Sequence, residues 1–245
     1  MTFFLPVAAL VARDLLRFWR EKARVLGFVG SPLLFWLMIG SGFGNLAFFF
    51  PGTLVLTVMF SAVFSTMSLI EDRKDGFLLS MLVSPAPRGA MVLGKVLGST
   101  LLAWIQGVIF LAFVPLTGLR PGLEGFLEAS LVVLLISLAF TTFGFVLAWR
   151  MESTQGFHAV MNLLLFPLWL ASGALFPITT AHGWMQVLMR VNPVTYMVAA
   201  VRWALDRPTA GMAIGTSLMV VGTLAAVLFA LATISATRKS TRSFA

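Results

Sequence analysis

The sequence contains no cysteine and only two histidines, His158 and His182. Without cysteine the chain has no disulfide framework, no thiolate metal site and no cysteine nucleophile, and the redox compartment stays undetermined. Two histidines that lie far apart in the sequence are too few for a convincing metal site. We therefore expect neither a metal nor a cofactor bound to this chain.

Charged residues are also scarce. Only 11% of the 245 residues are charged and 59% are hydrophobic, and the mean hydropathy is +0.98. An ordinary soluble domain is about a quarter charged and about half apolar. Because a soluble domain of this length has too little interior for so much apolar surface, the composition predicts a membrane protein.

The charge balance is strongly basic, with a net charge of +8. This balance could suggest a nucleic-acid partner, but the basic residues sit in short patches beside long apolar runs rather than along one continuous stripe. We therefore expect the lipid bilayer as the surrounding medium and no nucleic acid.

Six windows of the sequence contain no Asp, Glu, Lys or Arg and are each long enough to cross a hydrocarbon core of about 30 Å as a helix. They are residues 25–43, 51–70, 96–117, 129–149, 157–176 and 211–236. The windows predict an all-α integral membrane protein with six transmembrane helices in one domain. In this scheme residues 1–24 precede the first span, 177–210 separate the last two, and 237–245 form a tail.

The distribution of basic residues predicts the orientation in the membrane. Six spans place both termini on one side, and that side carries thirteen of the 17 Lys and Arg residues. Basic residues are enriched in cytoplasmic segments. We therefore expect a multi-pass protein of the cell's inner (plasma) membrane with both termini in the cytoplasm.

The N-terminal segment, residues 1–24, starts with an apolar stretch but is not a secretory signal. It has no basic region before the stretch, and Arg13 and Asp14 stand where a small-residue cleavage site would be required. As a helix the segment has two stripes, one of Arg13, Arg17, Arg20 and Arg24 and an opposite one of Val11, Leu15, Phe18 and Trp19. This pattern favours an amphipathic helix in the membrane interface over a simple extension of the first span.

The connection 71–95 carries a cluster of charges followed by an apolar stretch. Asp75 is a suitable helix N-cap, and Pro85 and Pro87 are suitable stop signals, which predicts a helix of about two turns over residues 76–83. Its side chains are apolar on nearly every side. The pattern fits a helix packed under the bundle and fits equally a docking surface for a cytoplasmic partner.

The outer segment 177–208 contains Trp184, Tyr196 and Trp203, and Gly and Pro residues divide it into short pieces. Trp and Tyr favour the membrane boundary, and the pieces are too short to cross the membrane. We therefore expect two short interfacial or re-entrant helices before the last span.

Residues 89–95 match a nucleotide-binding P-loop up to Gly94 and Lys95, but Val96 replaces the Ser or Thr that binds magnesium. The string has no preceding buried strand and leads into a span, so we do not interpret it as a nucleotide site.

Four G-x-x-x-G pairs occur in the sequence, including Gly94 with Gly98. This number exceeds the chance expectation too little to assign a helix interface.

Gln106 and Asn162 are the conspicuous amides within the spans. Polar groups at this depth face the bundle or a cavity, and an interhelical hydrogen bond is favoured over a contact with substrate. The windows hold no Asp, Glu, Lys or Arg that could relay a proton, so a transporter of this kind takes its energy from elsewhere. An uncharged bundle suits an apolar or amphiphilic cargo.

The string 71–88, continued at 92–96, resembles the permease subunits of type 2 ATP-binding-cassette (ABC) exporters. A second match comprises residues 171–178, 192–196 and Arg202, and Pro51-Gly52 opens the second span as in that family. The resemblance implies a half-transporter that pairs with a second permease, usually an identical copy. It also implies separate ATPase subunits that bind ATP and magnesium, so this chain is not itself an enzyme.

The resemblance further implies that the ATPase contacts the segments 13–24 and 76–88. The residues implied are Arg13, Arg17, Arg20, Arg24, Phe77, Leu78, Met81, Leu82 and Arg88. The cargo implied is a drug, a lipid or a lipid-linked saccharide. A membrane-embedded enzyme and a structural membrane protein without ATP-coupled transport are the alternatives.

Overall fold

The computed structural model describes residues 3–20, 22–83, 87–206 and 212–237, and the side chains at positions 22–26, 28, 29, 79 and 82 lie outside that description. The described residues form helices and contain no strand. The α-helices are α1 (Phe4–Arg20), α2 (Lys22–Gly42), α3 (Leu46–Ser65), α4 (Ser68–Lys74), α5 (Phe77–Val83), α6 (Arg88–Leu111), α7 (Gly122–Arg150), α8 (Thr154–Leu170), α9 (Gly183–Val191), α10 (Pro193–Leu205) and α11 (Ile214–Thr237).

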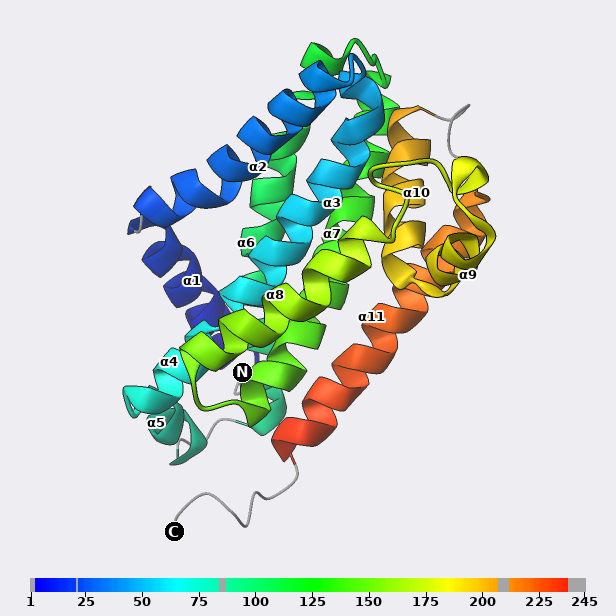
Figure 1. The fold of residues 1–245 in the computed structure, drawn as a ribbon. Coiled ribbons are helices and arrows are strands. Elements are labelled where there is room, and N and C mark those ends of the chain that lie inside the picture. Colours follow the sequence, from blue (N-terminus) through cyan, green and yellow to red (C-terminus); the bar gives the residue numbers. More distant parts are fainter. Residues whose placement is uncertain (1–2, 21, 84–86, 207–211, 238–245) are drawn as a thin grey trace.

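The centre of the molecule is a bundle in which α3, α6 and α7 contact one another, with α11 along α7 and α1 along α6 (Figure 1). Small residues allow this close packing. A Cβ atom added to Gly107 of α6 would lie 2.5 Å from Val133 of α7 and 2.8 Å from Val58 of α3. Without a hydrophobic driving force between helices in lipid, such close approach is a main source of helix association.

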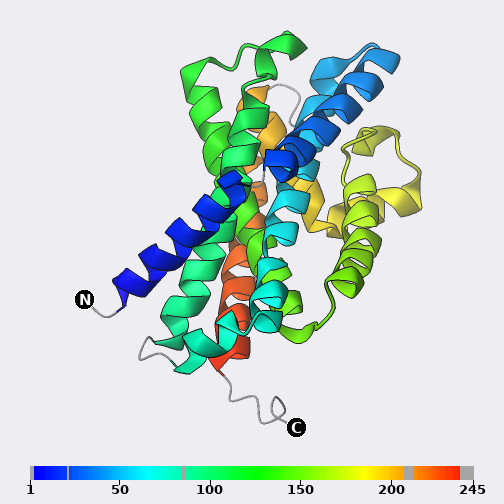
Figure 2. The same cartoon turned by 90° about the vertical axis from the view of Figure 1, so that its left-hand side faces the viewer.

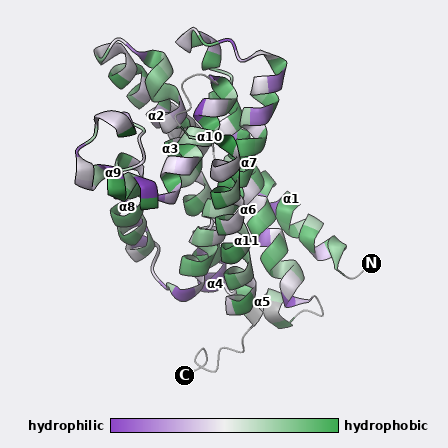
Figure 3. Ribbon diagram, turned by 90° about the vertical axis from the view of Figure 1, so that its right-hand side faces the viewer, coloured by the Kyte–Doolittle hydropathy of each residue, from purple (hydrophilic) through white to green (hydrophobic). Residues whose placement is uncertain are grey.

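Four helical segments of the described chain are long and apolar enough to cross a membrane: Leu46–Lys74, Arg88–Leu111, Gly122–Arg150 and Ile214–Ala236. They cover four of the six predicted windows, which confirms a multi-pass helical membrane protein. Figure 3 shows hydrophobic residues along the outer flank of α11, where Met219 and Val227 are exposed. The remaining two windows fall on α2 and α8, and the crossing of the membrane by these helices stays a prediction.

Helix α8 ends earlier than the window 157–176 predicted. The side-chain amide of Asn192 donates hydrogen bonds to the carbonyls of Leu168, at 2.5 Å, and Ala171, at 2.8 Å, at the end of the helix. Gly173 follows with a φ of 78°, a left-handed conformation that glycine adopts without strain. Asn192, which is distant in the sequence, therefore provides hydrogen-bond partners for the last carbonyls of α8. The apolar residues of the window that follow the helix form a turn instead.

Helix α3 begins before its predicted window because Asn45 provides a cap. The side chain of Asn45 accepts a hydrogen bond of 2.9 Å from the backbone N–H of Phe48. A Cβ atom on Gly40 would lie 2.6 Å from the Leu46 side chain, so α2 and α3 form a tight hairpin. The connection between α2 and α3 is therefore short.

The predicted N-cap role of Asp75 is wrong. The backbone N–H of Asp75 donates to the carbonyl of Glu71, which places Asp75 at the C-cap of α4. The chain then turns at Gly76, whose φ is 73°, and the carbonyl of Gly76 accepts the hydrogen bond from Ser80 in the first turn of α5. The predicted two-turn helix itself is confirmed as α5.

The start of α1, the helices α4 and α5, and the end of α11 lie in the lower half of Figure 1. The α2–α3 and α6–α7 connections lie at the opposite end, as Figure 2 also shows. The two short helices predicted in the outer segment are present as α9 and α10. Their position relative to the bilayer, and the side that faces the cytoplasm, stay predictions.

Candidate functional site

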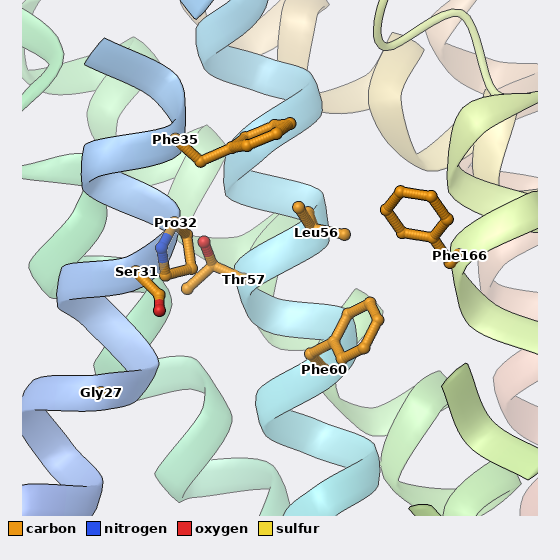
Figure 4. A pocket seen from close by; sticks show the side chains of 8 residues that line it. All are labelled: Gly27, Ser31, Pro32, Phe35, Leu56, Thr57, Phe60 and Phe166. Atoms are coloured by element: carbon orange, nitrogen blue, oxygen red, sulfur yellow. The ribbon is translucent and has the colours of Figure 1, made fainter. Parts of the chain in front are cut away.

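A groove with a volume of about 550 Å³ opens between α2, α3 and α8 (Figure 4). Its lining residues are Gly27, Ser31, Pro32, Phe35, Leu56, Thr57, Phe60 and Phe166. None of these side chains is charged. The hydroxyl of Thr57 donates a hydrogen bond of 2.9 Å to the carbonyl of Thr53 within its own helix, so the groove presents a nearly apolar wall.

Two of the residues of α2 that line the groove are small. Gly27 and Ser31 are one helical turn apart and therefore lie on the same face, while Phe35, Phe60 and Phe166 contribute aromatic rings to the lining. Ser31 and Phe166 are exposed, so the groove is open at the surface of a single chain.

Two segments that carry the resemblance meet beside the groove. The indole N–H of Trp169 donates a hydrogen bond of 2.7 Å to the carbonyl of Gly52, and a Cβ atom on Gly52 would lie 2.6 Å from the Cβ of Ala174. The pair Pro51-Gly52 and the turn 171–176 are thus in direct contact. Only glycine allows this approach of α3 to the turn.

Arg202 of α10 holds the same junction from the other side. Its guanidinium donates long hydrogen bonds to the carbonyls of Phe48, at 3.5 Å, and Gly173, at 3.4 Å, and lies 4.7 Å from the centre of the Phe48 ring. Burial lowers the pKa of Arg202 from its ordinary value, and Asp206 partly opposes this effect. The sequence placed Arg202 in a motif but gave no sign of these contacts.

The residues predicted to contact an ATPase on α5 differ in exposure. Leu78 is buried, and Phe77 and Met81 are partly buried against the core. Val83, which the prediction omitted, is 84% exposed. The side chain of Leu82 lies outside the described residues. Helix α5 therefore packs against the core on one side and presents Val83 on the other, and docking of a partner on this helix stays a prediction.

The arginines predicted to contact an ATPase also differ from one another: some form ion pairs within the chain and others are exposed. Arg13 forms an ion pair with Asp72, and Arg17 with Glu71 at 2.8 Å. Arg20 on α1 and Arg88 at the start of α6 are exposed, and Arg24 has a side chain outside the described residues. Contact of these arginines with an ATPase stays a prediction.

Six charged side chains from α1, α4 and α6 form one ion cluster, composed of Arg13, Asp14, Arg17, Glu71, Asp72 and Lys95. Lys95 is central and only 3% of its side chain is exposed, while Asp14 and Asp72 are exposed by 5% and 2%. Helix α6 begins at Arg88, before the start of the predicted charge-free window 96–117, and therefore includes Lys95. Three positive and three negative groups balance one another, as buried charges require.

Arg73 has a different partner from the rest of its charged string. Its guanidinium donates hydrogen bonds to the carbonyls of Met151, at 2.9 Å, and Trp149, at 2.7 Å. These carbonyls lie at the C-terminal end of α7, where intrahelical partners are missing and a positive charge is favourable. The connection after the second span is therefore joined to the end of α7.

Gln106 does not form the predicted interhelical hydrogen bond among the described residues. Gln106 is fully buried, and neither its amide nitrogen nor its amide oxygen has a hydrogen-bond partner among the described residues. Asn162 is exposed on α8. For Gln106 the prediction was wrong, because the sequence does not tell which face of a helix meets a polar neighbour. For Asn162 it stays a prediction. Among the described residues no group of three or more His, Asp or Glu could hold a metal ion.

The fold is that of a multi-pass helical membrane protein. A model of the ABC-2 type transporter family matches residues 6–205, and the chain belongs to this family.

Three relatives illustrate the likeness. The chain is 27% identical over 215 residues to ycf38 of Cyanophora paradoxa, named as a transport permease, with 82% of this chain and 74% of the relative covered. It is 28% identical to the daunorubicin resistance ABC transporter permease protein DrrB1 of Streptomyces coeruleorubidus, over 78% of this chain and 71% of the relative. It is 25% identical to nodulation protein J of Rhizobium leguminosarum bv. trifolii, over 75% of each chain.

Proposed function

We propose that this chain is the permease subunit of an ATP-driven exporter, in which a separate ATPase supplies the energy and the chain itself catalyses no reaction. The cargo is an amphiphilic or hydrophobic molecule such as a drug, a lipid or a lipid-linked saccharide. The observation that carries the proposal is the uncharged groove between α2, α3 and α8 in a member of the ABC-2 family.

The chemistry of the groove favours an apolar cargo. Moving a charge away from water into this lining is costly because none of the lining side chains that the structure describes carries a charge. The volume of about 550 Å³ suits a drug-sized ligand, for which sites of about 300–1,000 Å³ are typical. The daunorubicin resistance in the name of one relative is consistent with such a cargo.

A second copy of the chain completes the path in this proposal. A single chain leaves the groove open, and the apolar side chains beside it on α2 and α8, including Leu34, Met38 and Leu163, are 63%, 75% and 74% exposed. Contiguous exposed apolar surface next to a groove suits an interface. A homodimer in the inner membrane, with α1 and α5 on the cytoplasmic side, brings two grooves together above two ATPase subunits.

The proposal is tested by purifying the native chain in mild detergent and identifying the proteins that co-purify. We expect a soluble ATPase in the complex and, in proteoliposomes, ATP-dependent movement of daunorubicin or of a fluorescent phosphatidylethanolamine. Turnover of a substrate by the purified chain without ATP would identify a membrane enzyme instead. Absence of both an ATPase and cargo movement would leave a structural role and reject the proposal.

A further inference from the structure

The part of α6 that partly matches a P-loop pattern is the surface against which α1 packs. A Cβ atom on Gly94 would lie 3.0 Å from the Leu10 side chain, and one on Gly98 would lie 3.3 Å from Oδ2 of Asp14. These distances are tight, so the two glycines let α1 lie directly against α6. The G-x-x-x-G pair is therefore a helix interface.

Lys95 lies between these two glycines in the sequence and places a charged group in the contact between α1 and α6. Its Nζ is 3.1 Å from both carboxylate oxygens of Asp14 on α1 and 2.5 Å from Oδ2 of Asp72 on α4. One buried cation thus joins two helices to a third.

The ion cluster also reaches α5. Arg13 forms an ion pair with Asp72, and its guanidinium lies 3.7 Å from the centre of the Phe77 ring on α5. A cation over an aromatic face is attracted by the electrons of the ring. The helices α1, α4, α5 and α6 therefore share one continuous set of charged contacts.

We infer that Lys95 is a positioning residue that fastens α1 and α4 to α6, so that a displacement of α1 or α5 moves α6 as part of the same rigid body. Buried charges resist separation because each loses its partner when the helices part. Such a contiguous element is what coupling between two sites requires. The consequence for transport rests on the proposed function, whereas the fastening itself does not.

The fastening is tested with spin labels on introduced cysteines, since the native chain has none. The label pairs are Leu16 with Ile109 and Val83 with Ile109, whose native side chains are exposed on α1, α5 and α6. In the otherwise native chain we expect one narrow distance distribution for each pair. Lys95→Met should broaden both distributions. Asp14→Asn should broaden the Leu16 pair alone, because the Lys95–Asp72 pair remains.

Lys74→Met is the matched control, because it makes the same chemical change at an exposed position of α4. It should leave both distributions unchanged. If Lys95→Met does not accumulate in the membrane, Asp14→Asn still tests the link between α1 and α6. Distributions for Asp14→Asn and Lys95→Met that match those of the native chain would overturn the inference.

A second measurement separates positioning from mere stability. At equal membrane abundance, we expect Asp14→Asn to keep ATP hydrolysis by the complex but to lower the cargo moved per ATP by about five-fold or more, the lower range of allosteric couplings. An unchanged ratio would overturn the role in coupling. If the native chain binds no ATPase, the proposed function fails, and the spin-label distances still decide the role of Lys95.

Discussion

The ammonium group of Lys95 lies 2.5 Å from Oδ2 of Asp72, which joins the beginning of α6 to the end of α4. Lys95 occupies the position that a P-loop lysine has in the sequence pattern, yet its partners are two carboxylates. The neighbouring glycines admit a helix rather than a phosphate. The same residues that fail as a nucleotide site therefore have a defined structural role.

Loss of Lys95 should be far more destabilising than loss of Arg17. Lys95→Met leaves two buried carboxylates with one partner fewer, and such a loss costs about 3–5 kcal/mol. Arg17 and Glu71 are 37% and 26% exposed, and pairs of this kind contribute about 0–1 kcal/mol. Thermal unfolding of both variants in detergent measures the difference. Equal loss for Lys95→Met and Arg17→Met would contradict the burial of the ion cluster.

Gly52→Ala should destabilise the junction of α3 with the turn 171–176. The added Cβ atom would lie 2.6 Å from the Cβ of Ala174, and forcing such an atom into a packed site costs about 1–3 kcal/mol. Gly215→Ala is the control, since a Cβ atom there meets nothing within 4 Å and alanine favours a helix. Thermal unfolding should show a lower Tm for Gly52→Ala and an equal or higher one for Gly215→Ala.

Filling the groove should reduce transport. Ser31→Trp places an indole in the space between α2, α3 and α8, so we expect cargo movement to fall about ten-fold or more, the effect of about 1.4 kcal/mol of lost binding. Leu131→Trp adds the same ring on α7, where Leu131 is 63% exposed, and should have little effect. Equal transport by both variants, at equal abundance and ATPase binding, would exclude the groove as the path.

Two substitutions distinguish the faces of α5. Val83→Asp changes an 84% exposed side chain and Leu78→Asp a 4% exposed one. We expect Val83→Asp to weaken ATPase co-purification while the protein stays inserted, and Leu78→Asp to lower membrane abundance because a charge enters the core. Normal ATPase binding and export by Val83→Asp would remove this face of α5 from the docking surface.

The orientation in the membrane can be measured with single cysteines at two exposed positions, Lys74 and Thr180. The excess of Lys and Arg at the end that carries the termini predicts that this end is cytoplasmic. In intact cells an impermeant thiol reagent should therefore label the cysteine at Thr180 and spare the one at Lys74. Labelling of Lys74 alone would reverse the orientation.

Much of the fold could be predicted from local sequence. Each of the six apolar windows falls on a helix, and the two short outer helices and the helix under the bundle also lie where the sequence placed them. These features depend on the apolarity, length and turn residues of one segment at a time. Helix ends were less accurate: α8 stops because Asn192 binds its last carbonyls, a contact that a local pattern does not contain.

The site required the tertiary structure. Arg13 and Asp72, or Gly52 and Trp169, are far apart in the sequence, and either pairing could be guessed only after the helices were placed. By itself the sequence determined a helical membrane protein, because burying apolar side chains in lipid depends on composition along the chain. It also determined the family resemblance, because the motifs that carry it are local strings of residues. Only the tertiary structure decided which charges neutralise one another and which glycines admit a neighbouring helix, because ion pairing and close packing depend on distances between side chains from different segments.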